Sequence, residues 1–115
     1  VLIRPAIKPA PETMQEHRDH IGQSFVFEVT ADLDGVVYGT DIYTDDSSIS
    51  TAVVHAGLLQ PGQRALIRVT MVPDQQSYRS STRNGITSSE WDSWYGAYRV
   101  ELVEGLRATK EVAPQ

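Results

Sequence analysis

One apolar run in the middle of the chain restricts the fold more than any other feature. Residues 43–57 read YTDDSSISTAVVHAG, so acidic and hydroxyl side chains come first, apolar residues follow, and a glycine ends the stretch. Four of the apolar residues recur at helical spacing on one side: Ile49, Ala52, Val53 and Ala56. Val54 makes the next face apolar too. The pattern predicts a helix buried on most sides, which other elements must enclose.

Residue types that favour helix termini stand at both ends of this run. A side-chain oxygen of Asp45, Asp46 or Ser47 can accept from the free backbone N–H groups of a first helical turn. The two carboxylates also suit the positive end of the helix dipole. Gly57 stands where a helix C-terminus favours a left-handed residue. We therefore expect Asp45, Asp46 or Ser47 to cap the helix and Gly57 to end it.

Alternating apolar residues predict strands on both sides of the helix. The predicted strands are FVFEVT (25–30), VVYGTDIY (36–43), RALIRVTMV (64–72) and AYRVELV (97–103). The first two flank the short turn ADLDG, so we predict that they form a hairpin. In the last strand, Tyr98, Val100 and Leu102 are expected to face inward. The predicted fold class is α+β, mostly β.

Length and composition fit one small domain and exclude several classes of protein. The 115 residues are the size of one domain, and 40% of them are hydrophobic. A net charge of -5 argues against a nucleic-acid surface. The chain has no cysteine, which excludes disulfides, thiolate chemistry and Cys-based zinc sites. No apolar run approaches the roughly 20 residues with which a helix crosses a bilayer.

Composition divides the chain into three parts. Residues 1–14 contain three prolines and predict an extended arm, followed by a domain at 15–104 and a tail at 105–115. The arm is either a linker from a larger protein or a strand added to a neighbouring chain through Leu2 and Ile7. Residues 12–22 are expected to form a short helix or turn. A start at Val1 is typical of an excised domain or a processed chain.

The longest stretch without a strand pattern is 73–96, which has 24 residues. Loops of this length are uncommon inside compact domains and are often functional. Its aromatic faces can stack on sugars or lipid, and its polar groups can bond hydroxyls or phosphates. Trp91 and Trp94 either contact a ligand or fold back over the core and pin the loop. The candidate ligand-binding residues are Tyr78, Arg79, Arg83, Asn84 and Tyr95, and both tyrosines are expected to be partly exposed.

His55 does not complete a catalytic arrangement with its neighbours in the sequence. Ser47 and Asp46 lie at the opposite end of the predicted helix, about 12 Å away along its axis. They cannot serve as the nucleophile and the orienting carboxylate of a hydrolase built around His55. A histidine near a helix C-terminus can bond the terminal carbonyls or hold a loop. We expect a structural role for His55 and a chain that is not an enzyme.

Three groups of residues resemble metal sites, and each has a simpler interpretation. His17 and His20 could hold a divalent metal weakly, but their polar surroundings favour a solvated face. Asp32-Leu33-Asp34-Gly35 resembles the start of a calcium loop, but the twelfth position is a tyrosine, so a turn is expected. A second acidic cluster, in which helix capping competes with calcium binding, comprises Asp41, Asp45 and Asp46. We expect no metal and no cofactor.

Two separated motifs follow each other in an order that resembles a known family. The first comprises Gly39-Thr40, Tyr43, Ser47-Ser48-Ile49 and His55-Ala56-Gly57. The second comprises Tyr78, Ser81-Thr82-Arg83-Asn84-Gly85, Thr87-Ser88, Trp91, Trp94, Gly96 and Arg99-Val100. Over about residues 24–103 the chain resembles the LCCL domain, a module named after clotting factor C, cochlin and a late-gestation lung protein. The likeness implies a central helix wrapped by irregular antiparallel strands.

The resemblance also implies a function. Ser50 stands where the helix of animal members usually has Cys, so the chain is similar to the cysteine-free bacterial members. The family is largely extracellular and non-enzymatic, with proposed binding of lipopolysaccharide, carbohydrate or other surface ligands. We therefore expect an extracellular, periplasmic or cell-surface module that binds a glycan, a glycolipid or another surface protein. The alternatives are a structural subunit that oligomerises through residues 1–14 and a hydrolase built around His55.

Overall fold

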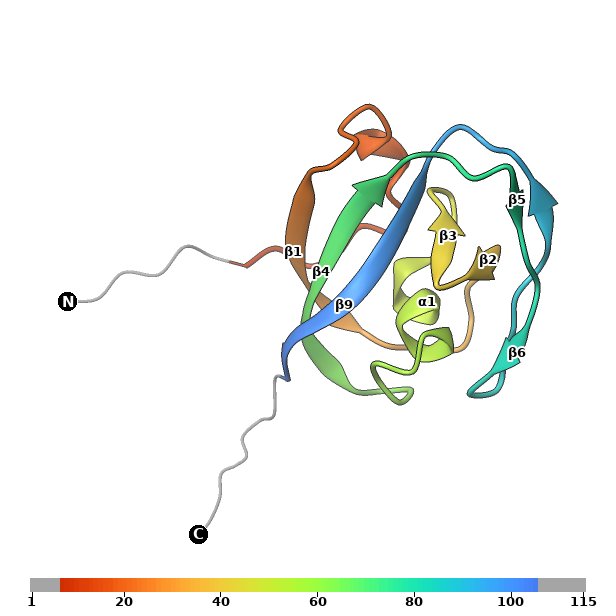
Figure 1. Cartoon of the computed structure of the whole chain (residues 1–115). Coiled ribbons are helices and arrows are strands. Elements are labelled where there is room, and N and C mark those ends of the chain that lie inside the picture. Colours follow the sequence, from red (N-terminus) through yellow and green to blue (C-terminus); the bar gives the residue numbers. More distant parts are fainter. Residues whose placement is uncertain (1–6, 106–115) are drawn as a thin grey trace, which may run out of the picture.

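A five-stranded antiparallel sheet forms one side of the molecule in the computed structural model, which describes residues 7–105 (Figure 1). The strands lie in the order β1 (Ser24–Thr30), β4 (Arg64–Val72), β9 (Ala97–Gly105), β3 (Ile42–Thr44) and β2 (Gly39–Thr40). The single α-helix of the described residues, α1 (Ile49–His55), packs behind this sheet. The predicted fold class, α+β and mostly β, is confirmed.

The helix is enclosed on both sides, as its apolar faces require. Six of its seven residues are buried. It contacts β1 and β9 of the sheet on one side and the short strands β6 (Thr82–Arg83) and β7 (Ile86–Thr87) on the other. Gly57 has a φ of 86°, which glycine adopts without strain, and it ends the helix as predicted.

The predicted capping by Asp45, Asp46 and Ser47 is wrong. The N-cap is Ser48, one residue after the last of the predicted caps, and it makes no side-chain capping bond. A turn at Thr44–Ser47 precedes the helix, so these side chains are directed to other donors. Asp45 binds Arg18 and Trp94, Asp46 accepts from Thr44, and Ser47 accepts from the backbone N–H of Tyr38.

The predicted hairpin of 25–30 with 36–43 is also wrong. β1 pairs with β4 along its whole length, and 36–43 is broken at Asp41, whose φ of 68° makes the tight turn between β2 and β3. The preceding turn at 31–35 is tied to the helix instead. The Asp32 carboxylate accepts from the hydroxyls of Thr51 at 2.8 Å and Ser50 at 3.1 Å. Burial alone would raise the pKa of Asp32, but these bonds and one from the Asp34 N–H lower it.

The two long strands agree with the prediction in position but not in every side chain. β4 has the predicted bounds, and its alternating residues Ala65, Ile67, Val69 and Met71 are buried. In β9, Tyr98 is buried, but Leu102 is exposed although it pairs with the buried Ile67. The inward placement predicted for Leu102 is therefore wrong. The seven-residue helix is about 10 Å long. The nine-residue strand extends about 30 Å and runs past it.

The segment before β1 lies against the sheet. Glu28 of β1 donates to the Lys8 carbonyl and accepts from the Ala10 N–H, and Met14 is fully buried. A short 3-10 helix, η1 (Gln15–His17), stands within the stretch expected to be a helix or turn. The division of the chain at residue 15 and the oligomerisation through 1–14 stay predictions. Leu2 and the tail after Gly105 lie outside the described residues.

The segment 73–96 is a layer of short strands rather than an irregular loop. β5 (Ser77–Tyr78) pairs with β8 (Trp91–Asp92), and β6 pairs with β7 through a turn at Asn84 and Gly85. We call these the β5–β8 ribbon and the β6–β7 hairpin. They lie on the side of α1 away from β1, β4 and β9 (Figure 1). Strands of two residues are too short to show an alternating pattern in the sequence.

Candidate functional site

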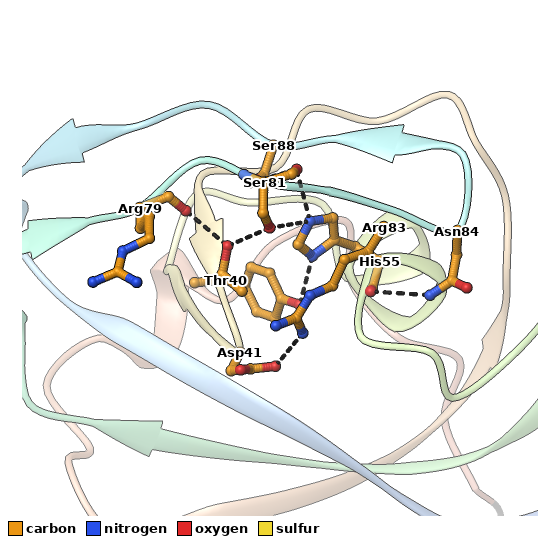
Figure 2. A network of polar contacts seen from close by, with 9 residues as sticks. Thr40, Asp41, His55, Arg79, Ser81, Arg83, Asn84 and Ser88 are labelled. Carbon is orange, nitrogen blue, oxygen red and sulfur yellow. Dashed lines mark hydrogen bonds and ion pairs between the residues drawn. The ribbon is translucent and has the colours of Figure 1, made fainter.

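His55 is fully buried at the end of α1 and links the helix to the β6–β7 hairpin (Figure 2). Its Nε2 lies 3.1 Å from the carbonyl oxygen of Ser81 and 3.2 Å from the hydroxyl of the same residue. Its Nδ1 lies 3.0 Å from the hydroxyl of Tyr43. These partners fit the tautomer in which Nε2–H donates to the carbonyl and Nδ1 accepts from the phenol. Burial raises the pKa of Tyr43 to about 12, so it is a neutral donor.

The polar residues around His55 bond to one another, as Figure 2 shows. The Thr40 hydroxyl lies 2.6 Å from that of Ser81 and donates to the carbonyl of Arg79. The Asn84 amide donates to the His55 carbonyl at 3.3 Å. Arg83 pairs with Asp41 at 2.7 Å. The network fastens the hairpin to the helix and to β2.

The geometry supports the structural role predicted for His55. No carboxylate is among its hydrogen-bond partners in the described part of the chain. Its ring has no exposed surface on which a substrate could bind. A hydrolase built around a histidine needs a carboxylate that orients the ring and a ring surface that the substrate can reach. Nothing in the arrangement therefore favours that alternative.

The candidate metal sites do not assemble. Within residues 7–105, no group of three or more His, Asp or Glu side chains is placed to hold a metal ion. Asp41 points to Arg83, whereas Asp45 is buried against Arg18. The solvated face predicted for His17 is wrong, because its ring is half-buried and packs on Phe25, with 4.2 Å between the ring centroids.

Among residues 7–105 no helix has the length and apolar character that crossing a membrane requires.

A buried carboxylate fixes the far end of the segment 73–96. Asp45 is 0% exposed and accepts two bonds from the Arg18 guanidinium, at 2.7 and 2.8 Å. Hydrogen bonding to Asp45 raises the pKa of Arg18. The indole Nε1 of Trp94 donates to the same carboxylate at 3.0 Å. A Cβ on Gly96 would lie 2.6 Å from an oxygen of Asp45, so a residue without a side chain is needed there.

An aromatic surface covers this end of the domain, and we define it by Tyr38, Trp91, Trp94 and Tyr95. Ring centroids of successive members lie 5.7, 6.0 and 5.0 Å apart, all close to edge-to-face. Trp91 is 46% exposed and Tyr95 is 71% exposed. The guanidinium of Arg18 lies 5.0 Å from the Tyr95 ring centroid, within reach of a cation–π contact.

Two hollows adjoin the aromatic surface. The smaller, which we call the cage, has a volume of about 90 Å³ and is lined by Tyr38, Thr44, Asp46, Trp91 and Trp94. The larger, which we call the groove, has a volume of about 470 Å³ and is lined by Ser77, Tyr78, Arg79, Glu90, Trp91 and Asp92. Trp91 lines both hollows.

The five predicted ligand residues are divided between the two halves of the segment 73–96. Arg79 lines the groove and Tyr95 belongs to the aromatic surface. Tyr78 is only 2% exposed, so its predicted exposure is wrong. Its hydroxyl bonds to Asp74, and its ring lies beneath the groove. Arg83 and Asn84 lie in the β6–β7 hairpin, where both contact the domain itself.

Several residues at this surface were not among the predicted ligand residues. Trp91 was left between two possibilities and proves exposed, whereas Trp94 is half-buried and pins the segment through Asp45. Tyr38 was missed because it belongs to a predicted strand, and Asp46 was interpreted as a helix cap or a calcium ligand rather than as part of an aromatic site. A partner for Arg18 was also invisible, because Asp45 is 27 residues away in the chain.

Comparison with known proteins agrees with this geometry. A family model described as the LCCL domain matches residues 11–98, which is well over half of the 115-residue chain. The chain belongs to the LCCL domain family. The resemblance that the two motifs predicted is confirmed, and this LCCL domain has no cysteine. The central helix wrapped by short antiparallel strands is the arrangement that the resemblance implied.

Its relatives are longer proteins with different names. Transcriptional regulatory protein rxt3 of Schizosaccharomyces pombe is 38% identical over 59% of this chain and 20% of its own length. Human cochlin is 33% identical over 69% of this chain and 14% of its own length. Human cysteine-rich secretory protein LCCL domain-containing 2 is 40% identical over 45% of this chain and 10% of its own length. This LCCL domain thus spans a fifth or less of each of these three proteins.

Proposed function

We propose that this domain is a non-catalytic binding module for a glycan or a glycolipid. The observation that carries the proposal is the exposed aromatic surface beside the groove. Trp91 and Tyr95 expose ring faces on which sugar rings can stack. Exposed aromatic residues in such numbers, next to a hollow, are more typical of a binding site than of an ordinary surface.

The fold holds this surface rigidly, which favours binding because little order has to be created when the ligand arrives. The indole of Trp94 bonds to the buried Asp45, and its backbone N–H bonds to Asp74 at 3.0 Å. Trp91 is fixed by pairing of β8 with Tyr78 of β5. Charged groups on the rim of the groove supply donors and acceptors for sugar hydroxyls: Arg79, Glu90 and Asp92.

The charges favour the sugar part of a glycolipid over its phosphates. Asp46 lines the cage, and Glu90 and Asp92 line the groove beside a single cation, Arg79. Like charges near a phosphate would oppose its binding. The net charge of the whole chain, -5, is also negative and likewise opposes the binding of phosphates.

We propose further that the domain works outside the cell or at its surface. One relative is named a secretory protein, which supports this location, whereas another is named a transcriptional regulatory protein. The bacterial origin likewise stays a prediction. Localisation of the protein in its source cells by fractionation tests the proposal, and its recovery from the cytosol or nucleus would contradict it.

A glycan array with the full chain tests the binding function. We expect binding that falls at least tenfold in Trp91→Ala and Tyr95→Ala, because each removes a stacking face. Val26→Ala is the matched control: Val26 is exposed on β1, at the opposite edge of the sheet from β2. Binding by no glycan, or equal binding by all three variants, would reject the proposal.

The contribution of the remaining candidates can be measured in the same assay. Arg79→Ala is expected to weaken binding, since Arg79 lines the groove beside Trp91. Ligand roles for Tyr78, Arg83 and Asn84 stay predictions. Arg83→Ala and Asn84→Ala decide whether the bound glycan extends onto the β6–β7 hairpin, and Tyr78→Phe decides whether the hydroxyl beneath the groove contributes.

A further inference from the structure

The cage has the geometry of a box with aromatic walls. The rings of Tyr38 and Trp91 meet at 71°, and those of Trp91 and Trp94 meet at 81°. Successive walls therefore stand nearly perpendicular to one another. Asp46 and Thr44 complete the lining. The volume of about 90 Å³ can hold a group of a few heavy atoms, because a water molecule occupies about 30 Å³ in the liquid.

Several residues of the lining are held by bonds that the ligand need not break. Trp94 is held by Asp45 and Asp74, and the backbone N–H of Tyr38 donates to the Ser47 hydroxyl at 2.9 Å. The Asp46 carboxylate is oriented by the Thr44 hydroxyl, which donates to its Oδ1 at 2.6 Å. The cage is therefore formed before any ligand enters.

The lining selects the charge of the occupant. Aromatic faces carry partial negative charge and attract cations within about 6 Å of the ring centre. The carboxylate of Asp46 adds a full negative charge at the wall. Its only hydrogen-bond donor among the described residues is an uncharged hydroxyl, and the nearby Arg18 forms its ion pair with Asp45 instead. An anion would be repelled, whereas an ammonium group, protonated or methylated, matches both the rings and the carboxylate.

We infer that the cage binds an ammonium group that is carried by the glycan, an inference that rests on the proposed function. Trp91 forms a wall of the cage and of the groove, so the proposed sugar site and the ammonium site share one side chain. Glu90 and Asp92 on the groove extend the same preference for a cationic ligand. The glycan recognised is therefore one with free or methylated amino groups.

A peptide with a methylated lysine and a phosphocholine headgroup carry the same cation, but the surroundings favour them less. A peptide commonly binds along a free strand edge. β2 at this edge has two residues, and the neighbouring Tyr38 already pairs with Ser89. The phosphate of phosphocholine would meet Asp46 and Glu90.

Tryptophan fluorescence gives a direct readout, because the only two tryptophans of the chain are both walls of the cage. The full chain is titrated with oligomers of glucosamine, with the matching oligomers of N-acetylglucosamine, and with tetramethylammonium. We expect the free amine to bind at least about tenfold more tightly than the N-acetylated form. We also expect this preference to disappear as rising pH deprotonates the amine.

Asp46→Asn keeps the bond from Thr44 and removes the charge, so we expect it to abolish the preference while N-acetylated oligomers bind as before. Glu104→Gln, which removes one exposed charge from β9, is the matched control and should change nothing. Trp91→Ala should lose tetramethylammonium binding. Thermal unfolding of each variant checks that it is folded.

The outcomes separate this inference from the proposed function. Equal binding of the free and N-acetylated oligomers overturns the ammonium specificity and leaves glycan binding intact. Binding of tetramethylammonium but of no glycan on the array or in solution rejects the proposed function and, with it, the glycan as carrier. Tighter binding of a trimethyl-lysine peptide or of phosphatidylcholine vesicles than of glucosamine oligomers also overturns the glycan as carrier.

Discussion

The β6–β7 hairpin and the β5–β8 ribbon belong to one segment of the chain, but they use their side chains differently. In the hairpin, Ser81, Arg83 and Asn84 bond to the rest of the domain. In the ribbon, Trp91 is exposed, and so is Tyr95, which follows β8 in the chain. Polar groups that are satisfied internally offer little to a ligand, whereas exposed aromatic faces retain their capacity to bind.

The largest effect is expected at the anchor behind the aromatic surface. Arg18→Ala leaves the carboxylate of Asp45 buried without its cation, which should lower the free energy of unfolding by about 3 kcal/mol. Urea denaturation measures the loss. Arg68→Ala is the control, since its pair with Glu101 is exposed and 3.7 Å long. Equal losses in the two variants would mean that Asp45 does not anchor this surface.

His55→Phe is the corresponding test on the hairpin side. The new ring has a similar size but leaves the Tyr43 hydroxyl without its acceptor, at a cost of about 2 kcal/mol. The Ser81 carbonyl loses the imidazole and keeps the bond from the Ser88 N–H. Hydrogen exchange should show faster exchange in the hairpin and little change in the ribbon. Glycan binding by the folded variant should persist. Its loss would show that the two halves do not act separately.

Alkaline pH should destabilise the domain through three buried tyrosines, of which Tyr78 lies in the ribbon and Tyr43 contacts His55. Burial raises the pKa of Tyr43 to about 12 and puts those of Tyr78 and Tyr98 well above the ordinary value of 10. Below pH 10 both the folded and the unfolded states are protonated, and the contribution is fully present. As pH rises from 10 towards 12, the unfolded state ionises first, so stability falls by about 1 kcal/mol per pH unit for Tyr43.

The free energy of unfolding is measured at a series of pH values above 10 and compared with the ionisation of the tyrosines, which tyrosinate absorbance reports. Tyr43→Phe removes one of the three groups and should make the fall above pH 10 shallower. A curve that is unchanged by this substitution would contradict the burial of the phenol.

The smallest effect is expected for Arg83→Ala. Arg83 and Asp41 are an exposed pair, so the free energy of unfolding should change by less than about 0.5 kcal/mol despite a separation of 2.7 Å. Thermal unfolding checks the stability, and the glycan array checks binding. A loss of binding without a loss of stability would extend the ligand surface onto the hairpin and narrow the contrast between the two halves.

The sequence predicted the elements in which a single period repeats. β4 and the buried helix were found because several turns or pleats of regular alternation fix which residues face the core. Gly57 was recognised because a helix end restricts the residue type. The partner of β1 was not predictable in this way. A nearby turn favoured 36–43, but the Asp32 side chain bonds to the helix instead.

The candidate site was predicted only in its general place. The segment 73–96 was selected because of its length and its aromatic residues, and the aromatic surface does lie there. The separate fates of Trp91 and Trp94 depend on Asp45, which is 49 residues away from Trp94 in the chain. Contacts of that range leave no local pattern, so neither the anchor nor the cage could be read from the sequence.

The short pairing of Lys8 and Ala10 with Glu28 has a consequence for solubility. β1 is an edge strand, and an open edge is a template on which a second molecule can add its own strand. The proline-containing segment covers the middle of that edge, and its prolines cannot offer N–H groups to continue the sheet. A protein shortened to begin at residue 12 would lose this cover but keep the buried Met14, and we expect it to aggregate through β1 even with its ligand surface intact.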